Sequence, residues 1–277
     1  MMRLMRSDGD LAAGAVYLAV LALAAAFAAL PILVSIVLSF DGRTFIGPFP
    51  PQSLSLRWYA EFFNDSYYHE GLKTSLLVSG IATLVSTVTG VAAAVALDRF
   101  DFPGRQVLQA LLVSPLVIPT VVIGFAMLMF ASRIGIVDGL PRLIMGHIII
   151  TLPYVVRTTL ASLVGIRPSL FEAALSLGAT PAQALLKVTL PLAKTGIVAG
   201  AIFAFVMSFD EVAVSLFLSD PFVYTLPVAL LAQMRADLNL TVAAVSVIFL
   251  VFTLLLIWLL DRTIGLDRLV GQGIYRV

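Results

Sequence analysis

The sequence contains no cysteine and few charged residues. Of its 277 residues none is Cys, 12% are charged and two are histidines, His69 and His147. Without thiols the chain forms no disulfide and offers no thiolate for catalysis or metal binding. Two histidines so far apart in the sequence are typical of packing or interfacial positions, not of a metal cluster. The formal net charge is +1, so composition gives no reason to expect a nucleic-acid partner or an acidic interaction arm.

Apolar residues dominate instead. With 60% hydrophobic residues and a mean hydropathy of +1.05, the chain has too little polar surface for a soluble domain, so lipid is its expected solvent. Six apolar runs each approach the ~20 residues that a helix needs to cross a bilayer. The sequence therefore predicts an all-α membrane protein, one domain over residues 1–277 with six transmembrane helices, at 11–40, 74–97, 106–131, 143–163, 195–218 and 241–260.

The first apolar run and the charge distribution predict the orientation. Arg3 and Arg6 precede 30 uncharged residues, 11–40, which is longer than the ~7 to 15 apolar residues of a secretory signal and predicts an uncleaved anchor. Eleven of the 17 Lys and Arg residues lie in segments on the side of the N terminus and six on the other side. This bias favours a multi-pass protein with both termini in the cytoplasm.

Two longer outer connections each contain a short helix. In residues 55–63, SLRWYAEFF, Leu56, Tyr59 and Phe63 recur at helical spacing beside Trp58 and Phe62, which is typical of a segment at headgroup level. In residues 225–234, TLPVALLAQM, Pro227 suits the first turn of another short helix. Both segments are therefore predicted to lie on the outer surface.

Helix-capping signals interrupt the membrane pattern between the fourth and fifth runs. Ser169 and Glu172 have the spacing of a capping box, which predicts a helix start at Ser169. Gly178 follows at a position where helices commonly end in a left-handed conformation. Thr180 and Gln183 then repeat the start signal. We expect two short capped helices joined by a glycine turn.

These helices form a helix-turn-helix over residues 167–194, on the cytoplasmic side. The second helix is expected to run to about Thr189, with Pro191 beyond it. The pair shows apolar side chains such as Leu170 and Phe171 and is too apolar to be left in water. From the residues alone, either a partner protein or the lipid surface could cover this helix pair.

Two adjacent acidic residues, Asp210 and Glu211, fall inside the fifth run. A charged side chain at the bilayer centre costs roughly 2.5 to 3.5 kcal/mol on insertion scales, so these carboxylates should face a wet pathway or a partner subunit. Neighbouring residues on a helix point about 100° apart, so one carboxylate can face the pathway while the other meets a neighbouring helix. A pathway for cations and hydrogen bonding between subunits both remain open. Further pathway contacts near the outer mouth are predicted at Asp220, Tyr224, Trp58 and Tyr59.

The segment EAALSLGATPAQALLKVTLP resembles the EAA loop of permease subunits in bacterial binding-protein-dependent ABC importers. The family pattern falls on Glu172, Ala173, Ala174, Gly178, Val188, Leu190 and Pro191. Val188 alone departs from it, as valine in place of isoleucine. The resemblance implies that this loop, with Ser169, is a coupling helix seated in a cleft of a separate ATPase. It also implies that ATP and magnesium bind to that ATPase, so this chain is not an enzyme and carries no cofactor.

Further segments, SLRWYAEFF, SFDEVAVSLFLSDP and TLP, resemble the second permease of spermidine/putrescine-type importers. The resemblance implies an inner-membrane subunit that pairs with a homologous permease, two ATPase copies and an extracytoplasmic binding protein, and moves a small cationic solute by alternating access. Another small organic solute, such as an amino-acid derivative or an opine, is the alternative within this class. A proton-coupled secondary transporter is disfavoured because no inverted repeat is visible, and a membrane enzyme because no convergent catalytic set is visible.

Overall fold

The computed structural model describes residues 8–44, 47–236 and 239–264, most of which are helical. The chain divides into two compact units, one of Met1–Asn64 with Ala236–Val251 and one of Asp65–Arg235 with Phe252–Val277. The first unit contains α1, α2 and the start of α12: α1 (Asp8–Ser39), α2 (Arg57–Asn64) and α12 (Thr241–Ile264). The helix predicted in residues 55–63 is confirmed as α2, and its place on the outer side stays a prediction.

In the first unit, α2 turns two of its four aromatic residues inward. Trp58 and Phe62 are buried, and Trp58 packs against Leu240 and Ala244. These rings were expected at the lipid headgroups, but the start of α12 covers Trp58 instead. The helix therefore stabilises the core of this unit.

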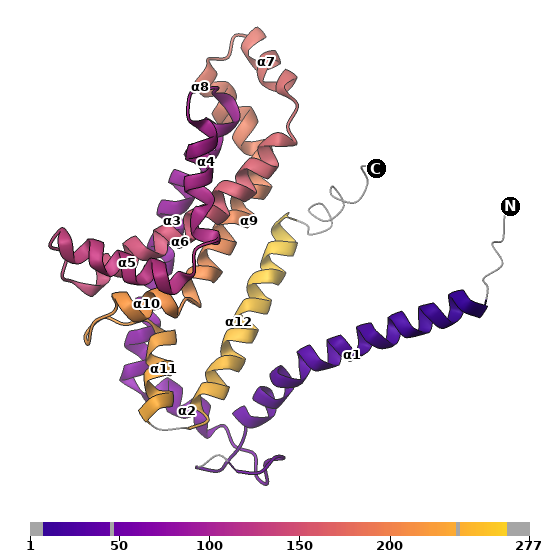
Figure 1. The fold of residues 1–277 in the computed structure, drawn as a ribbon, viewed down its shortest axis with the longest axis vertical. Helices are drawn as coiled ribbons and strands as arrows, with labels where there is room; N and C mark the ends of the chain where they lie inside the picture. Colours follow the sequence, from indigo (N-terminus) through magenta and orange to yellow (C-terminus); the bar gives the residue numbers. More distant parts are fainter. Residues whose placement is uncertain (1–7, 45–46, 237–238, 265–277) are drawn as a thin grey trace. The chain divides into compact units, whose positions relative to one another are not determined.

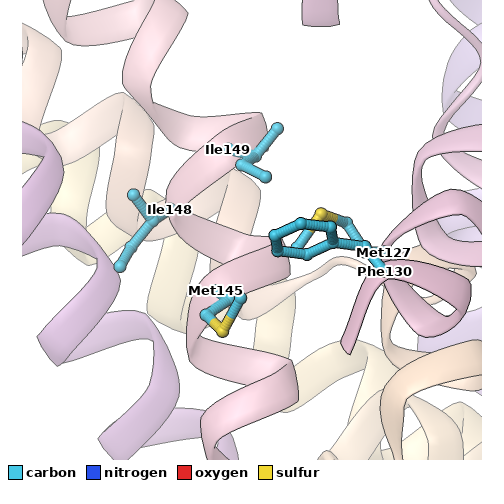
Figure 2. A pocket seen from close by; sticks show the side chains of 5 residues that line it. All are labelled: Met127, Phe130, Met145, Ile148 and Ile149. Carbon is cyan, nitrogen blue, oxygen red and sulfur yellow. The ribbon is translucent and has the colours of Figure 1, made fainter. Parts of the chain in front are cut away.

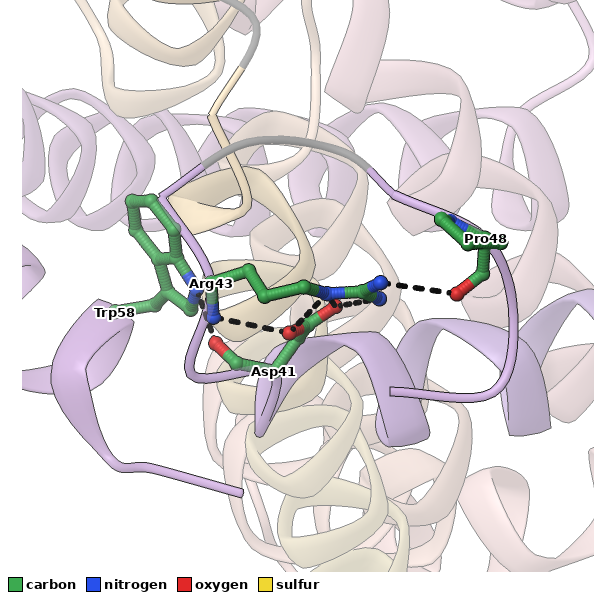
Figure 3. Close-up of polar contacts among 4 residues, drawn as sticks. All are labelled: Asp41, Arg43, Pro48 and Trp58. Carbon is green, nitrogen blue, oxygen red and sulfur yellow. Dashed lines mark hydrogen bonds and ion pairs between the residues drawn. The ribbon is translucent and has the colours of Figure 1, made fainter. Parts of the chain in front are cut away.

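A buried carboxylate fixes the loop that follows α1 (Figure 3). Asp41 accepts hydrogen bonds from the Arg43 guanidinium, and the Arg43 Nη1 donates to the carbonyl of Pro48 at 3.1 Å. The Trp58 Nε1 donates to the Asp41 carbonyl at 2.7 Å. The hydrogen bonds from Arg43 outweigh burial and hold the pKa of the Asp41 carboxyl below its usual range. The loop is thereby tied to α2.

The second unit is built around a bundle of α3 (Ser66–Arg99), α6 (Gly139–Val164) and α9 (Leu190–Phe209) (Figure 1). Close approach of these helices depends on small residues. A Cβ at Gly200 of α9 would meet the Thr158 side chain and the Val155 backbone of α6. Membrane helices commonly pack through such small residues, because lipid provides no hydrophobic force between them. Because α6 packs against both α3 and α9, it is the central helix of the unit.

The predicted span 106–131 is bent, which corrects the expectation of one straight helix. It consists of α4 (Arg105–Val113), the short 3-10 helix η1 (Ser114–Leu116) and α5 (Thr120–Arg133), and the helix direction bends by 107° at the break. Pro119 occupies the N-cap of α5 in an extended conformation. Because proline has no N–H and disfavours a helical residue before it, the helix stops and restarts there.

Among the residues that the structure describes, four helices are long and apolar enough to cross a membrane, namely Val16–Ser39, Ser66–Arg99, Gly139–Val164 and Pro181–Phe209. The bent pair α4–α5 makes a fifth if it counts as one span. Within the described residues, the apolar part of α12, Thr241–Leu255, is shorter than a span. The chain is therefore a multi-span helical membrane protein, and the predicted number of six spans is not confirmed.

Candidate functional site

The EAA segment folds as a helix-turn-helix at one end of the second unit, where α7 (Pro168–Ser176) and α8 (Pro181–Ala184) meet (Figure 1). Gly178 has φ +89°, so the predicted left-handed turn is confirmed. The second capping box is also confirmed, since the Gln183 N–H donates to Thr180 Oγ1 at 3.3 Å and the Thr180 N–H donates to Gln183 Oε1 at 3.0 Å. These two features set the angle between the helices.

The first capping box is not formed, which corrects the predicted helix start. The helix α7 begins at Pro168 with Arg167 as its N-cap, and among the described residues no side chain caps it. Proline at the first helical position already has a helical φ and lacks the N–H that a cap would satisfy. Ser169 therefore lies inside the helix, and the carboxylate of exposed Glu172 has no hydrogen-bond partner within the described chain.

The second helix continues into the fifth span, although an end was expected near Thr189. A π-helical turn, η2 (Leu185–Thr189), joins α8 to α9, and the Leu190 N–H donates to the Leu185 carbonyl. Pro191 then falls in the first turn of α9, where its missing N–H is tolerated. As a result, residues from Pro181 to Phe209 form one continuous helical rod.

Arg99, at the end of α3, connects the bundle to the EAA segment. Its guanidinium lies 4.2 Å from the ring centroid of Phe171 in α7, and its Nη2 donates to Thr189 Oγ1 in η2 at 3.0 Å. A cation–π contact is worth roughly 0.5 to 2 kcal/mol, depending on desolvation. In the sequence, Arg99 is only one of the eleven basic residues on the side of the N terminus. Its partners lie about 70 and 90 residues further along the chain, so spacing gave no signal for this contact.

The EAA segment exposes several large apolar side chains. Large exposed side chains on it are Leu170, Leu175, Leu177 and Leu186, and Leu177 is 89% exposed. Ala173 is also exposed, while Ala174, Val188 and Leu190 are half-buried. Several large apolar side chains exposed within one short segment are typical of an interaction site.

The acidic pair lies at a break in the predicted span 195–218, which corrects the expectation of one helix. The helix α9 ends at Phe209 and α10 (Ala213–Leu218) begins three residues after Asp210. Glu211 caps α10, since its Oε1 accepts from the Val214 N–H at 3.0 Å and its carbonyl accepts from Ser215 Oγ at 2.7 Å. These bonds satisfy backbone groups that a break at membrane depth would leave exposed.

Asp210 has a different environment from its neighbour. It is exposed, and within the described residues its carboxylate makes no hydrogen bond or ion pair. Of the two carboxylates, only that of Glu211 is used in supporting the backbone at this break. Asp210 is therefore the carboxylate available to a solute or to another subunit.

The two outer candidates of the second unit have structural partners. The Asp220 carboxylate accepts from the N–H groups of Phe222, Val223 and Gly139, each at 2.8 Å, and lies 3.7 Å from Arg142. Burial alone would raise the pKa of Asp220, but the three N–H groups and Arg142 outweigh it and lower this pKa. Asp220 thus joins the loop after α10 to the start of α6.

Tyr224, just before α11 (Leu226–Ala236), packs against Tyr67 with ring centroids 4.6 Å apart and ring planes tilted by 32°, and its hydroxyl donates to the Tyr67 carbonyl at 3.3 Å. Trp58 and Tyr59 belong to the first unit, where the Tyr59 hydroxyl hydrogen-bonds to Ser39 Oγ at 2.8 Å. A part for these residues, and for Asp220, in a pathway stays a prediction.

A hollow of about 420 Å³ lies between α5 and α6 (Figure 2). Its lining consists of apolar side chains: Met127, Phe130, Met145, Ile148 and Ile149. Such a surface suits hydrocarbon, not a charged solute, because burying an unpaired charge is costly. Asp210 is not part of it.

Comparison with known proteins gives one consistent answer. A family profile described as "Binding-protein-dependent transport system inner membrane component" matches residues 86–263. The spermidine/putrescine permease PotC of Shigella flexneri is 30% identical over 248 residues, covering 90% of this chain and 93% of that protein. The putrescine permease PotI of Escherichia coli K12 is 28% identical, with 79% and 80% covered. The trehalose permease SugB of Mycobacterium tuberculosis is 32% identical, with 74% and 76% covered.

Solved structures show the same fold. A bacterial ABC transporter for import of the acidic polysaccharide alginate superposes with a TM-score of 0.71 at 18% identity, covering 91% of this chain and 96% of that one. The same TM-score is found for the alginate transporter in complex with its pentasaccharide-bound periplasmic protein. At this identity the likeness concerns the fold. From the profile and the PotC match, the chain belongs to the family of inner-membrane components of binding-protein-dependent transport systems and is a permease subunit of an ABC importer.

Proposed function

We propose that this chain forms half of a translocation pathway for a small cationic solute of the polyamine class, such as putrescine or spermidine. The observation that carries the proposal is the exposed carboxylate of Asp210 at the break in the fifth span, which has no hydrogen-bond or ion-pair partner among the described residues. A carboxylate there offers a counter-charge to an ammonium group that has left water. The PotC and PotI relatives, whose names specify polyamines, support the same solute class.

The proposed assembly contains a homologous second permease, two ATPase subunits and an extracytoplasmic binding protein. ATP and magnesium bind to the ATPases, which cover the apolar face of α7 and α8, and both termini of this chain are cytoplasmic. ATPase closure pushes on residues 169–190. Because α8, η2 and α9 form one rod, a displacement at the EAA segment tilts the fifth span and moves the acidic break at its far end.

Cofactor dependence in proteoliposomes tests the transport class. The purified permease pair, its ATPase and its binding protein are reconstituted, and uptake of radiolabelled putrescine is measured. We expect uptake to require ATP, the ATPase and the binding protein together. Uptake driven by a pH gradient alone would instead identify a proton-coupled transporter.

A second candidate is an uncharged solute of the same importer class, because the trehalose permease SugB is 32% identical to this chain. Binding of putrescine, spermidine and trehalose to the cognate binding protein, measured by calorimetry, separates the two candidates. Binding of the sugar without the amines would refute the polyamine assignment and leave the importer class standing.

A further inference from the structure

The break between α9 and α10 requires support from outside the fifth span. The helix α10 has six residues, which is too short to hold its direction by its own hydrogen bonds. A covalent link of three residues, 210–212, connects it to α9. Without a further contact the angle between the two helices, and hence the direction of the Asp210 carboxylate, would vary.

His147 of α6 provides such a contact. The side chain is buried, with 1% exposure, and both ring nitrogens have partners. Its Nδ1 lies 2.7 Å from Ser208 Oγ in the last turn of α9, and its Nε2 lies 3.0 Å from Ser215 Oγ in α10. One imidazole therefore bridges the two sides of the break.

The hydrogen bonds around His147 have one consistent direction for a neutral ring. Ser215 Oγ donates its single proton to the Glu211 carbonyl at 2.7 Å, so it accepts from His147 and the proton lies on Nε2. A neutral imidazole with the proton on Nε2 accepts at Nδ1, so Ser208 Oγ is the donor there. The resulting chain runs from Ser208 through His147 and Ser215 to the backbone carbonyl of Glu211, directly after the acidic pair.

Packing next to His147 leaves α10 little freedom to move. A Cβ at Gly146 would meet the Leu218 and Val214 side chains of α10, and a Cβ at Gly124 of α5 would meet the Val214 backbone. The short helix is thus held closely by α5 and α6. These apolar contacts have little direction, whereas the two hydrogen bonds of His147 specify one rotation of α10.

We infer that His147 is a positioning residue that clamps α10 to α9 through Ser208 and Ser215 and thereby sets where the Asp210 carboxylate points. The clamp itself rests on geometry. Its consequence for transport rests on the proposed function.

A distance measurement tests the clamp without any substrate. The chain has no cysteine, so Phe203→Cys in α9 and Leu216→Cys in α10, both exposed, introduce a unique pair of thiols for spin labels. The distance between the two spin labels is measured by electron paramagnetic resonance in the assembled importer in nanodiscs, with partner subunits free of reactive thiols. We expect His147→Phe to broaden or shift the distance distribution.

Two further variants keep this test decisive. Should His147→Phe fail to assemble, the Ser208→Ala/Ser215→Ala double variant removes the same two bonds with little change in volume and should broaden the distribution too. Ser86→Ala, the matched control, removes a buried 2.7 Å bond between α3 and Thr151 of α6, one turn from His147, and should leave the distribution unchanged. An unchanged distribution in an assembled variant that lacks both His147 bonds overturns the clamp.

Transport measurements then test whether the clamp acts through Asp210. His147→Phe should lower putrescine uptake about tenfold in the parent chain but less than about twofold in an Asp210→Asn background, because coupled sites are not additive. His147→Gln, which keeps an amide at the reach of Nε2, should restore part of the uptake. Equal fold-losses in both backgrounds would show a general structural role and overturn the positioning role. A parent importer that moves no putrescine would refute the proposed substrate, while the distance measurement still decides the clamp.

Discussion

The backbone differs at the two ends of α9, since the helix continues through one end and breaks at the other. At the coupling junction, where α8 meets α9, a proline lies in the chain, yet the π-helical turn η2 keeps the rod continuous. At the acidic junction, where α9 meets α10, there is neither proline nor glycine, yet the helix breaks. Continuity at one end suits transmission of a displacement, and a break at the other end presents a carboxylate. The difference shows that hydrogen-bond partners, more than helix-breaking residues, decide where this span is interrupted.

The largest effect that separates the junctions is expected from Gly178→Leu. A leucine at φ +89° costs about 1 to 2 kcal/mol in backbone strain and should tilt α8, so that ATP hydrolysis continues while putrescine uptake falls by more than about tenfold. Transport and hydrolysis are measured on the same proteoliposomes. Gly104→Leu is the matched control, because Gly104 has φ +87° and, like Gly178, open space around its Cβ position within the described chain. Equal losses in both variants would mean that strain alone, not coupling, causes the defect.

At the acidic junction, the two carboxylates should respond unequally. Asp210→Asn should lower putrescine uptake about tenfold, equivalent to ~1.4 kcal/mol, without impairing assembly, because in the described part of the chain its carboxylate bonds to no other group. Glu211→Gln should cost about two- to threefold, since its amide oxygen can still accept from the Val214 N–H. Uptake rates and assembled yield are compared for both. A neutral effect of Asp210→Asn would favour hydrogen bonding between subunits over a pathway role.

A smaller effect is expected at the contact between the coupling junction and α3. Arg99→Met removes the cation above Phe171 and the bond to Thr189, so the solute moved per ATP hydrolysed should fall about two- to fivefold, or ~0.5 to 1 kcal/mol of coupling. Arg105→Met serves as the control, because its ion pair with Asp101 is exposed and such pairs contribute little. If both substitutions leave this ratio unchanged, Arg99 has no part in transmission.

The smallest effect concerns the caps of α7 and α8. Thr180→Ala removes a formed capping box and should destabilise the second helix by about 0.5 to 2 kcal/mol, seen as a lower Tm of the detergent-purified complex. Ser169→Ala should leave Tm within error, because Ser169 lies inside α7 and caps nothing in the described chain. If Ser169→Ala lowered Tm more than Thr180→Ala, the result would favour the helix start at Ser169 that the sequence predicts.

The sequence by itself determined the features that are local along the chain. Apolar runs predicted most of the long helices, the left-handed turn at Gly178 and the Thr180–Gln183 box were predicted from short-range spacing, and the EAA pattern predicted the family. These succeed because each depends on residues within one or two helical turns.

Tertiary structure alone decided where the spans bend, which of the two carboxylates caps α10 and which side chain holds α10 in place. Window-averaged hydropathy reports burial, not backbone geometry, so residues 106–131 and 195–218 looked continuous. His147 meets partners 61 and 68 residues away, and Arg99 meets Thr189 across 90 residues. The physical reason is that a hydrogen bond between helices depends on their packing in space, and no spacing in the sequence encodes that packing directly.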